Sequence, residues 1–322
     1  MPMKYRAIIH EAWAMTQTNK KLIWAFAFVP AVLTTIVSMV YLTYQVAAFY
    51  TSPYLNPTIP EDKDALTVVF NTLVASFQGN PGMTVFFLII VALIVIAYLM
   101  VPVFTQGALI QTLARLRAGQ ELPLVESFTY GFTRFLPLFE YNLAIKGFSL
   151  VSLLGDAAFA FRNLGPSVFS FLGWIFLFAI VVGLAVTLLF TFAEFYIVID
   201  QEKVVASMIK SSGLVVRQWH HTLFMLLLMS VIILRVILNL LVALVIPALV
   251  IAPFLLFTSM TYTIIGVVVG GILALVALYF TSYFLGIFHM FVTGVWTFTF
   301  LELTAHEKND INLHEAAVHQ EA

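Results

Sequence analysis

Residues Phe169 to Ala193 read FSFLGWIFLFAIVVGLAVTLLFTFA and carry no charged side chain. An α-helix needs roughly 20 apolar residues to cross about 30 Å of hydrocarbon. In lipid, only helices and closed barrels pair every backbone N–H and C=O group. The stretch therefore predicts a membrane-spanning helix. Similar runs elsewhere predict an all-α polytopic membrane protein.

The composition supports this class and excludes others. Hydrophobic residues make up 62% of the chain and charged residues 10%, against roughly 25% charged residues in a soluble domain. The net charge of −1 argues against a nucleic-acid partner, which needs a clustered basic surface. The chain has no cysteine, which excludes disulfides, thiolate metal sites and cysteine nucleophiles. We expect no cofactor, no metal site and no catalytic residue.

Hydrophobic length and helix breakers predict six spans, or seven if the long apolar region after Thr222 is divided further. The first is too long for a signal peptide, so we expect it to be retained. The predicted spans are Leu22–Tyr50, Met83–Ala114, Phe135–Phe161, Val168–Ile199, Thr222–Phe257 and Thr263–Leu303.

The lysine and arginine residues predict the orientation, because cytoplasmic loops carry an excess of them. Eleven fall on one side: Lys4, Arg6, Lys20, Lys21, Arg115, Arg117, Arg134, Lys203, Lys210, Arg217 and Lys308. Only Lys63 and Arg162 fall on the other side, while Lys146 and Arg235 lie within spans. We therefore expect both termini in the cytoplasm and the chain in the cytoplasmic (inner) membrane.

Three amphipathic segments precede the odd-numbered spans, with apolar residues at the spacing of one helix face. Their apolar sets are Tyr5, Ile8, Ile9, Ala12 and Trp13; Leu124, Val125, Phe128, Phe132 and Phe135; and Val204, Val205, Met208, Ile209, Ser212, Val215 and Val216. Such helices are expected to lie on the cytoplasmic leaflet, although any linker helix of a polytopic protein can have this pattern. The candidate lipid-headgroup contacts beside them are Lys20, Lys21, Arg134, Lys210, Arg217 and Trp219.

An interfacial helix followed by a helical hairpin would then occur three times, as a pseudo-threefold parallel repeat. The units are about 1–118, 119–200 and 201–305, within a single membrane domain of residues 1–305. Residues 306–322 form a polar cytoplasmic tail.

The stretch EFYIVIDQEKVVASMIKSSGLVVRQW, Glu194 to Trp219, resembles a recurring segment of bacterial six-span membrane proteins. These are similar to the membrane domain of glycerophosphoryl diester phosphodiesterases and to the YciC-like proteins. Ala206, Ser211, Leu214 and Trp219 take the characteristic positions, and Gly107–Leu143 is similar to an earlier loop of the group. The resemblance implies six helices and cytoplasmic interfacial helices without a catalytic residue.

Polar residues inside predicted spans form a candidate intramembrane site, because each charge is costly in lipid and is often functional. The candidates are Glu140, Lys146, Asp156, Glu194, Arg235 and Asn239. They either tie helices together or line a polar cavity. By helix rise, Lys146 could reach Glu194 or Glu140.

The sequence leaves three functions open. The leading hypothesis is a non-enzymatic membrane protein that binds or organises lipid, alone or with an unidentified membrane-protein partner. The alternative is a transporter or channel whose pathway passes Glu140, Lys146, Glu194 and Arg235. A remote third is an intramembrane enzyme, for which Ser149 and His289 are similar to the serine and histidine of rhomboid proteases.

Overall fold

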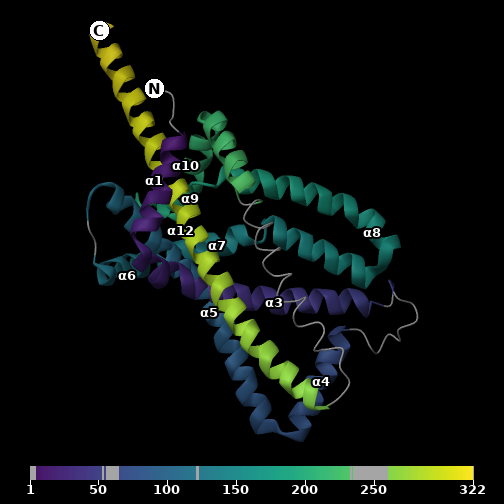
Figure 1. The fold of residues 1–322 in the computed structure, drawn as a ribbon. Coiled ribbons are helices and arrows are strands. Elements are labelled where there is room, and N and C mark those ends of the chain that lie inside the picture. The colour runs from purple at the N-terminus through teal and green to yellow at the C-terminus, as the bar shows by residue number, and fades with distance from the viewer. Residues whose placement is uncertain are drawn as a thin grey trace. The chain divides into compact units, whose positions relative to one another are not determined.

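The computed structural model describes residues 5–52, 54–55, 65–120, 123–232, 234 and 260–321, and every regular element in these ranges is a helix (Figure 1). The elements are α1 (Tyr5–Thr18), α2 (Lys20–Leu22), the π-helix η1 (Ile23–Phe28), α3 (Val29–Tyr50), α4 (Ala65–Gly79), α5 (Pro81–Arg117), α6 (Leu124–Thr133), α7 (Phe135–Lys146), α8 (Leu150–Leu189), α9 (Ala193–Val198), α10 (Val204–Arg217) and α12 (Met260–Glu321). A further helix, Trp219–Ile232, follows α10. The prediction of an all-helical fold is confirmed for these residues.

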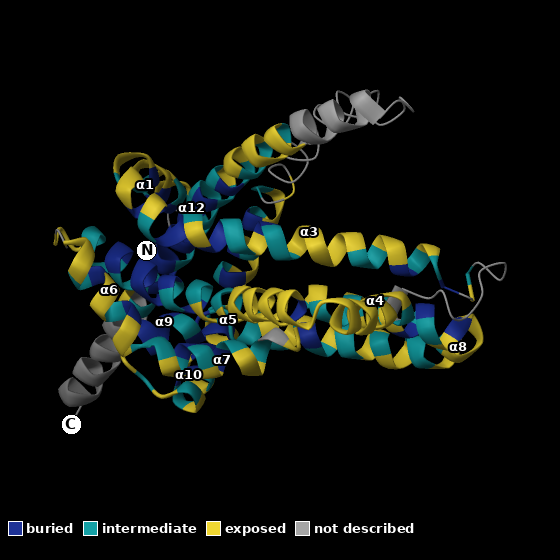
Figure 2. Ribbon diagram, turned by 90° about the horizontal axis from the view of Figure 1, so that it is seen from below, coloured by how far each residue is buried: buried dark blue, intermediate teal, exposed yellow. Residues whose placement is uncertain are grey.

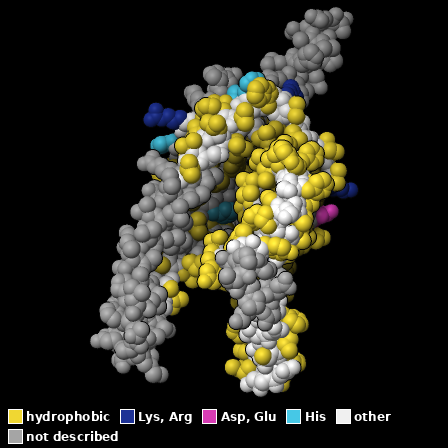
Figure 3. Space-filling view, turned by 90° about the vertical axis from the view of Figure 1, so that its right-hand side faces the viewer, with side chains coloured by type: hydrophobic (Ala, Val, Ile, Leu, Met, Phe, Trp, Pro, Cys, Tyr) yellow, Lys and Arg dark blue, Asp and Glu magenta, His cyan; other side chains and the backbone are white. Residues whose placement is uncertain are grey.

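Four helical stretches of the described chain are long and apolar enough to cross a membrane, or up to five if a bent pair counts as one span. The four are Lys20–Tyr50, Pro81–Arg117, Leu150–Val198 and Gly271–Ala305. On the face drawn in Figure 3, hydrophobic side chains cover most of the described surface and charged ones are few. These features are compatible with a membrane protein. The count of six spans stays a prediction, because much of the predicted span Thr222–Phe257 lies outside the described residues.

The predicted third span, Phe135–Phe161, is wrong as a single helix. α7 ends at Lys146, and Ser149 adopts an extended backbone with φ −66° and ψ 143°. The Ser149 hydroxyl accepts a hydrogen bond from the Ser152 N–H at 3.2 Å and so caps the start of α8. Serine favours this position because its oxygen satisfies a backbone donor that has no partner within the helix.

Helix α8 is a hairpin of two limbs, 150–164 and 166–189, divided at Gly165 with φ +82°. In the second limb, a Cβ placed on Gly183 would lie 2.6 Å from the Phe148 carbonyl oxygen. The second limb therefore returns to the point where the first began, and Figure 1 shows the chain doubling back. These limbs occupy the region of the predicted third and fourth spans.

The chain divides into two compact units. Unit 1 contains residues 1–35, 108–131 and 213–322. Its buried core comes from α1, η1, the end of α5 and the middle of α12. Glycines let the backbones approach closely here: a Cβ on Gly294 of α12 would meet Ala12 of α1 at 3.4 Å, and one on Gly286 would meet Ala27 of η1 at 3.4 Å. Small residues serve the same purpose in membrane helix packing.

Unit 2 contains residues 36–107 and 132–212. Its buried residues include Leu138 of α7, Phe192, Phe195 and Ile197 in or beside α9, and two serines of α10. In contrast, the apolar lengths of α3, α4 and α5 that belong to this unit are largely exposed (Figure 2). Exposed apolar helices of this kind are compatible with a hydrocarbon environment.

Candidate lipid-contacting site

Helix α10 presents three different faces along its length. Ser207, Ser211 and Leu214 are buried, and the Ser211 hydroxyl donates to the Leu189 carbonyl at 2.8 Å while accepting from the Phe192 N–H at 3.1 Å. A second face is apolar and exposed: Val205 is 69% exposed and Ile209 66%. A third, exposed face carries the basic residues. The helix therefore docks through its serines and leaves an apolar ridge uncovered.

Helix α6 has the same arrangement of faces. Ser127 and Gly131 are buried, while Val125 and Phe132 are 79% and 72% exposed. The third face carries Tyr130, whose hydroxyl donates to the Glu126 carboxylate at 2.9 Å. That hydrogen bond is the main reason why the pKa of Tyr130 is raised.

Three positions of α6 have counterparts in α10 with the same residue exposure. Because residue 127 corresponds to 207 and residue 131 to 211, the same shift of 80 positions aligns both the buried faces and the ridge residues Val125 and Val205. The threefold repeat itself stays a prediction. We name the most exposed apolar residues of the two helices, Val125 and Phe132 with Val205, Ile209 and Val216, the apolar ridges.

Helix α1, the first of the three predicted interfacial segments, is different. Two of its predicted apolar residues, Ile8 and Ala12, are buried in the core of unit 1, where Ala12 adjoins α12. Its exposed side carries Arg6, His10 and Trp13 rather than an apolar ridge. In α1, Ile8 and Ala12 of the predicted apolar face are therefore buried within the protein.

Basic and aromatic side chains lie together at the start of the first apolar stretch. Lys20 and Lys21 are exposed, and the half-exposed Trp24 ring lies 5.3 Å from the Tyr283 ring and 6.1 Å from the Tyr279 ring. Aromatic and basic residues of this kind are enriched at the headgroup level. The arrangement fits the predicted headgroup role of the two lysines.

The other predicted headgroup residues differ in their exposure and in their ion pairing. Lys210 forms an ion pair with Glu202 at 2.5 Å, so its charge is partly neutralised. Arg217 and Trp219 are exposed on either side of the bend that ends α10. Arg134 is half-buried at the junction of α6 and α7.

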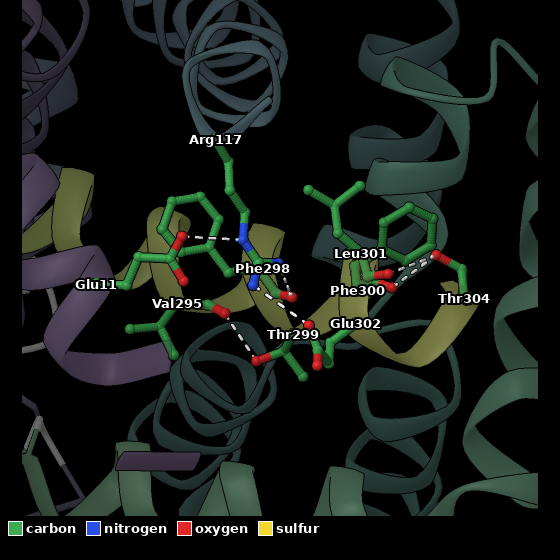
Figure 4. Close-up of polar contacts among 9 residues, drawn as sticks. All are labelled: Glu11, Arg117, Val295, Phe298, Thr299, Phe300, Leu301, Glu302 and Thr304. Carbon is green, nitrogen blue, oxygen red and sulfur yellow. Dashed lines mark hydrogen bonds and ion pairs between the residues drawn. The ribbon is translucent and has the colours of Figure 1, made fainter. Parts of the chain in front are cut away.

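Arg117, counted in the sequence only as a cytoplasmic charge, joins three helices of unit 1 (Figure 4). Its guanidinium donates to Glu11 of α1 at 3.1 Å, and to Glu302 at 3.3 Å and the Phe298 carbonyl at 3.0 Å, both of α12. The guanidinium also lies 4.9 Å from the centre of the Phe298 ring. This cluster is a structural tie at the basic end of α5.

The structure describes only some of the predicted intramembrane polar residues. Glu194 is half-buried, and Gln106 of α5 lies 3.4 Å from both of its carboxylate oxygens. Glu140 is exposed, and the Lys146 side chain, Arg235 and Asn239 lie outside the described residues. The predicted transport pathway therefore stays a prediction, because the side chains of two of its four residues lie outside what the structure describes.

Asp156, the remaining candidate, lines a cleft with a residue that the sequence placed in an outer loop. That residue is Arg162, which is 3% exposed. Its guanidinium donates to Gln45 Oε1 at 2.7 Å and to the Tyr44 hydroxyl at 3.2 Å. The spacing of Tyr41, Tyr44 and Gln45 on one face of α3 was the signal that could have indicated a polar partner.

Two further observations concern metal-ligating side chains and Ser149. No group of three or more metal-ligating side chains occurs in the part of the chain that the structure describes. The Ser149 hydroxyl caps α8, as described above.

Comparison of the chain with protein family models, curated proteins and solved structures gives no match. The resemblance to the phosphodiesterase membrane domains therefore stays a prediction, and the function is argued from the geometry alone.

Proposed function

We propose that this chain is a non-enzymatic integral membrane protein that binds lipid at the cytoplasmic leaflet. In this proposal, α6 and α10 lie in the plane of that leaflet, with both termini in the cytoplasm. The observation that carries the proposal is the inverted docking of these two helices. Each buries serine side chains, together with Gly131 on α6 and with Leu214 and Val215 on α10, and leaves its apolar ridge exposed.

In inverted docking, the polar face of an amphipathic helix packs on the protein and its apolar face stays exposed. This arrangement indicates contact with lipid, because exposing apolar surface to water is unfavourable. An amphipathic helix of a water-soluble protein turns its apolar stripe to the core. Leaving Val205 and Ile209 in water would forgo roughly 1.5–3 kcal/mol per side chain, whereas in the acyl region of a leaflet the same exposure is favourable. If α10 rests on hydrocarbon, its ridge contacts acyl chains while the Ser211 hydroxyl keeps its hydrogen bonds within the protein.

The bend after α10 supports an in-plane helix. The axes of Val204–Arg217 and Trp219–Ile232 differ by 94° across a break of one residue. If the second helix enters the membrane, a right angle places α10 along its surface. Trp219, at the bend, then lies where the headgroups meet the hydrocarbon.

The charges beside the ridges supply the headgroup contacts. On α10, Lys210 and Arg217 are roughly 100° from the ridge at 100° per residue, which directs them sideways to phosphate groups. Lys20 and Lys21, next to the Trp24 ring, are the freest cations of this set. Each such charge contributes roughly 1 kcal/mol of attraction to an anionic leaflet.

The test measures which lipids stay bound to the full-length protein in detergent, by native mass spectrometry with equal amounts of phosphatidylglycerol and phosphatidylcholine. In the variant Lys20→Gln/Lys21→Gln/Arg217→Gln, the preference for phosphatidylglycerol should fall by more than tenfold, because about 3 kcal/mol of attraction is lost. The matched control keeps the charge, as Lys20→Arg/Lys21→Arg with Arg217→Lys, and should keep the preference. An unchanged preference in the neutralised variant would refute the proposal.

A further inference from the structure

Arg162 is a buried cation whose described partners are all neutral. Its donors reach Gln45 and Tyr44, and its guanidinium lies 5.2 Å from the Tyr44 ring centre and 5.5 Å from that of Phe159. Among the described residues it forms no ion pair. A buried charge without a counter-ion is unfavourable, and the guanidinium has five N–H donors. Donors therefore remain for an external anion.

The cleft that Arg162 lines has a volume of about 630 Å³, lies in unit 2 and has both polar and apolar side chains in its walls. Tyr41, Tyr44 and Gln45 of α3 form one wall, Asp156 and Arg162 of α8 another, and Tyr98 of α5 a third. Tyrosine hydroxyls and the guanidinium are groups that bind phosphate oxygens. Asp156 has no hydrogen bond or ion pair among the described residues and is exposed.

An apolar groove adjoins this cleft. It has a volume of about 530 Å³ and lies between α3 and α4, with Met39, Val40, Ala47 and Val68 among its lining residues. Tyr44 lines both the cleft and the groove. A cleft that contains a guanidinium and tyrosine hydroxyls, and that shares Tyr44 with an apolar groove, suits a molecule with a polar head and a hydrocarbon tail.

The level of Arg162 along the helices indicates where such a molecule lies. α3 and the first limb of α8 run in the same direction: Tyr41 adjoins Gly155, and Ser52 donates to the Arg162 carbonyl at 2.9 Å. Gln45 follows Lys21 by 24 residues in one helical stretch, a rise of about 36 Å. The hydrocarbon core is about 30 Å thick, so Gln45, which accepts a hydrogen bond from Arg162, lies one membrane thickness along this stretch from Lys21.

We propose that Arg162 binds the phosphate of a phospholipid in the outer leaflet, with an acyl chain of that lipid in the groove between α3 and α4. The groove residues Thr43, Val40 and Met39 lead from the level of Gln45 toward the membrane centre, which is the direction an acyl chain takes. This site is separate from the cytoplasmic surface of α6 and α10.

The experiment uses the full-length protein that already carries Lys20→Gln/Lys21→Gln/Arg217→Gln, so that the cytoplasmic contacts do not contribute. Binding of phosphatidylglycerol, of diacylglycerol with the same chains, and of inorganic phosphate is measured by native mass spectrometry and thermal shift. Phosphatidylglycerol should bind at least about tenfold more tightly than either of the other two. Equal binding of inorganic phosphate, or of diacylglycerol, would overturn the proposal.

Variants in the same background test the named contacts. Arg162→Gln should weaken phosphatidylglycerol binding about tenfold, because a charged hydrogen bond to phosphate is lost. Ala47→Trp, at an exposed position of the groove, should weaken it similarly by filling the space of the chain. Asp156→Asn should strengthen it about twofold, since a negative charge about 9 Å along the helix is removed.

The last two variants keep the test decisive if Arg162→Gln does not fold. Lipid affinity that is unchanged in both Ala47→Trp and Asp156→Asn overturns the proposal. Val181→Trp of α8, at an exposed apolar position outside the lining of the cleft and the groove, is the matched control and should leave the affinity unchanged.

Discussion

Arg117 and Arg162 show how the same side chain serves two purposes in this protein. Arg117 is surrounded by two carboxylates and a carbonyl oxygen from α1 and α12. Arg162 is more deeply buried, but its described partners are an amide oxygen and a hydroxyl. An arginine whose charge is balanced by carboxylates, such as Arg117, holds helices together. An arginine whose described partners are neutral, such as Arg162, can still bind an anionic ligand.

We predict that Arg117→Met lowers the stability of the protein. The variant loses a hydrogen bond to a buried carbonyl and leaves Glu11 and Glu302 without their cation. The carboxylates are more than a third exposed, so solvent weakens those pairs, and we expect a total loss of about 2 kcal/mol. Thermal unfolding in detergent measures it. Arg6→Met, which removes an exposed arginine of α1, is the control, and an equal loss in both variants would contradict the structural role of Arg117.

A second prediction concerns Lys210, whose ammonium is held by Glu202 at 2.5 Å. Because this pairing competes with a lipid phosphate, Glu202→Gln should release the lysine and raise retention of phosphatidylglycerol about fivefold, the effect of roughly 1 kcal/mol. Native mass spectrometry gives the ratio. The double variant Glu202→Gln/Lys210→Gln should cancel the gain. A gain that persists in the double variant would show that Lys210 is not the group released.

For single residues, the sequence shows which polar side chains lie within apolar runs, but it does not show which residues they contact. Asp156 and Glu194 were identified as polar residues in apolar runs, but the partner of Glu194 is Gln106, which is neutral and 88 residues away. Arg162 was assigned to a loop because a charge at the end of an apolar run is normally a boundary. Its burial depends on α3, which local pattern does not reveal.

The helices α1, α6 and α10 illustrate the limit of periodicity at the scale of an element. All three have apolar residues at helical spacing, and the sequence predicts one role for them. The spacing identifies an apolar face but not what covers it: in α1, Ala12 adjoins α12, while in α10 Val205 and Ile209 are uncovered. The difference comes from the opposite faces, where Ser207 and Ser211 offer an alternative way of docking.

The turn of the α8 hairpin gives a prediction at this scale. Gly165 has φ +82°, and a Cβ there would lie 2.7 Å from the Tyr54 ring. Gly165→Ala should therefore destabilise the protein by roughly 1–3 kcal/mol, from backbone strain and the clash. Gly173→Ala is the matched control within the same helix, because its nearest neighbour atom is 3.7 Å away. Thermal unfolding of the two variants compares them, and equal midpoints would contradict the hairpin geometry.

For the whole molecule, composition and run length were sufficient to predict an all-helical fold with long apolar helices. They were insufficient for the helix boundaries between Phe135 and Leu189. In this region the helices are separated at Ser149, which caps α8, and at Gly165, which has a positive φ. The hydropathy of the sequence predicts the helix ends at other residues. The orientation in the membrane is predicted only from the uneven distribution of lysine and arginine. No contact within the protein tests it.

The absence of native cysteine allows a direct test of that orientation. Single cysteines are introduced as Thr18→Cys, Lys203→Cys and Tyr54→Cys, and intact cells are treated with a membrane-impermeant maleimide. Tyr54→Cys should react in intact cells, and the other two only after permeabilisation. Reaction of Lys203→Cys in intact cells would reverse the proposed topology.

The most direct test of the proposed function is the surroundings of α10, measured with spin labels on single cysteines in reconstituted bilayers. Labels at Val205, Ile209 and Val216 should collide with dissolved oxygen more than with a water-soluble nickel chelate, since their face rests on hydrocarbon. Labels at Lys210 and Arg217 should show the opposite preference. Equal access of the nickel chelate to Ile209 and Lys210 would show that the ridge faces water, and the account of α10 as a lipid-bound helix would be wrong.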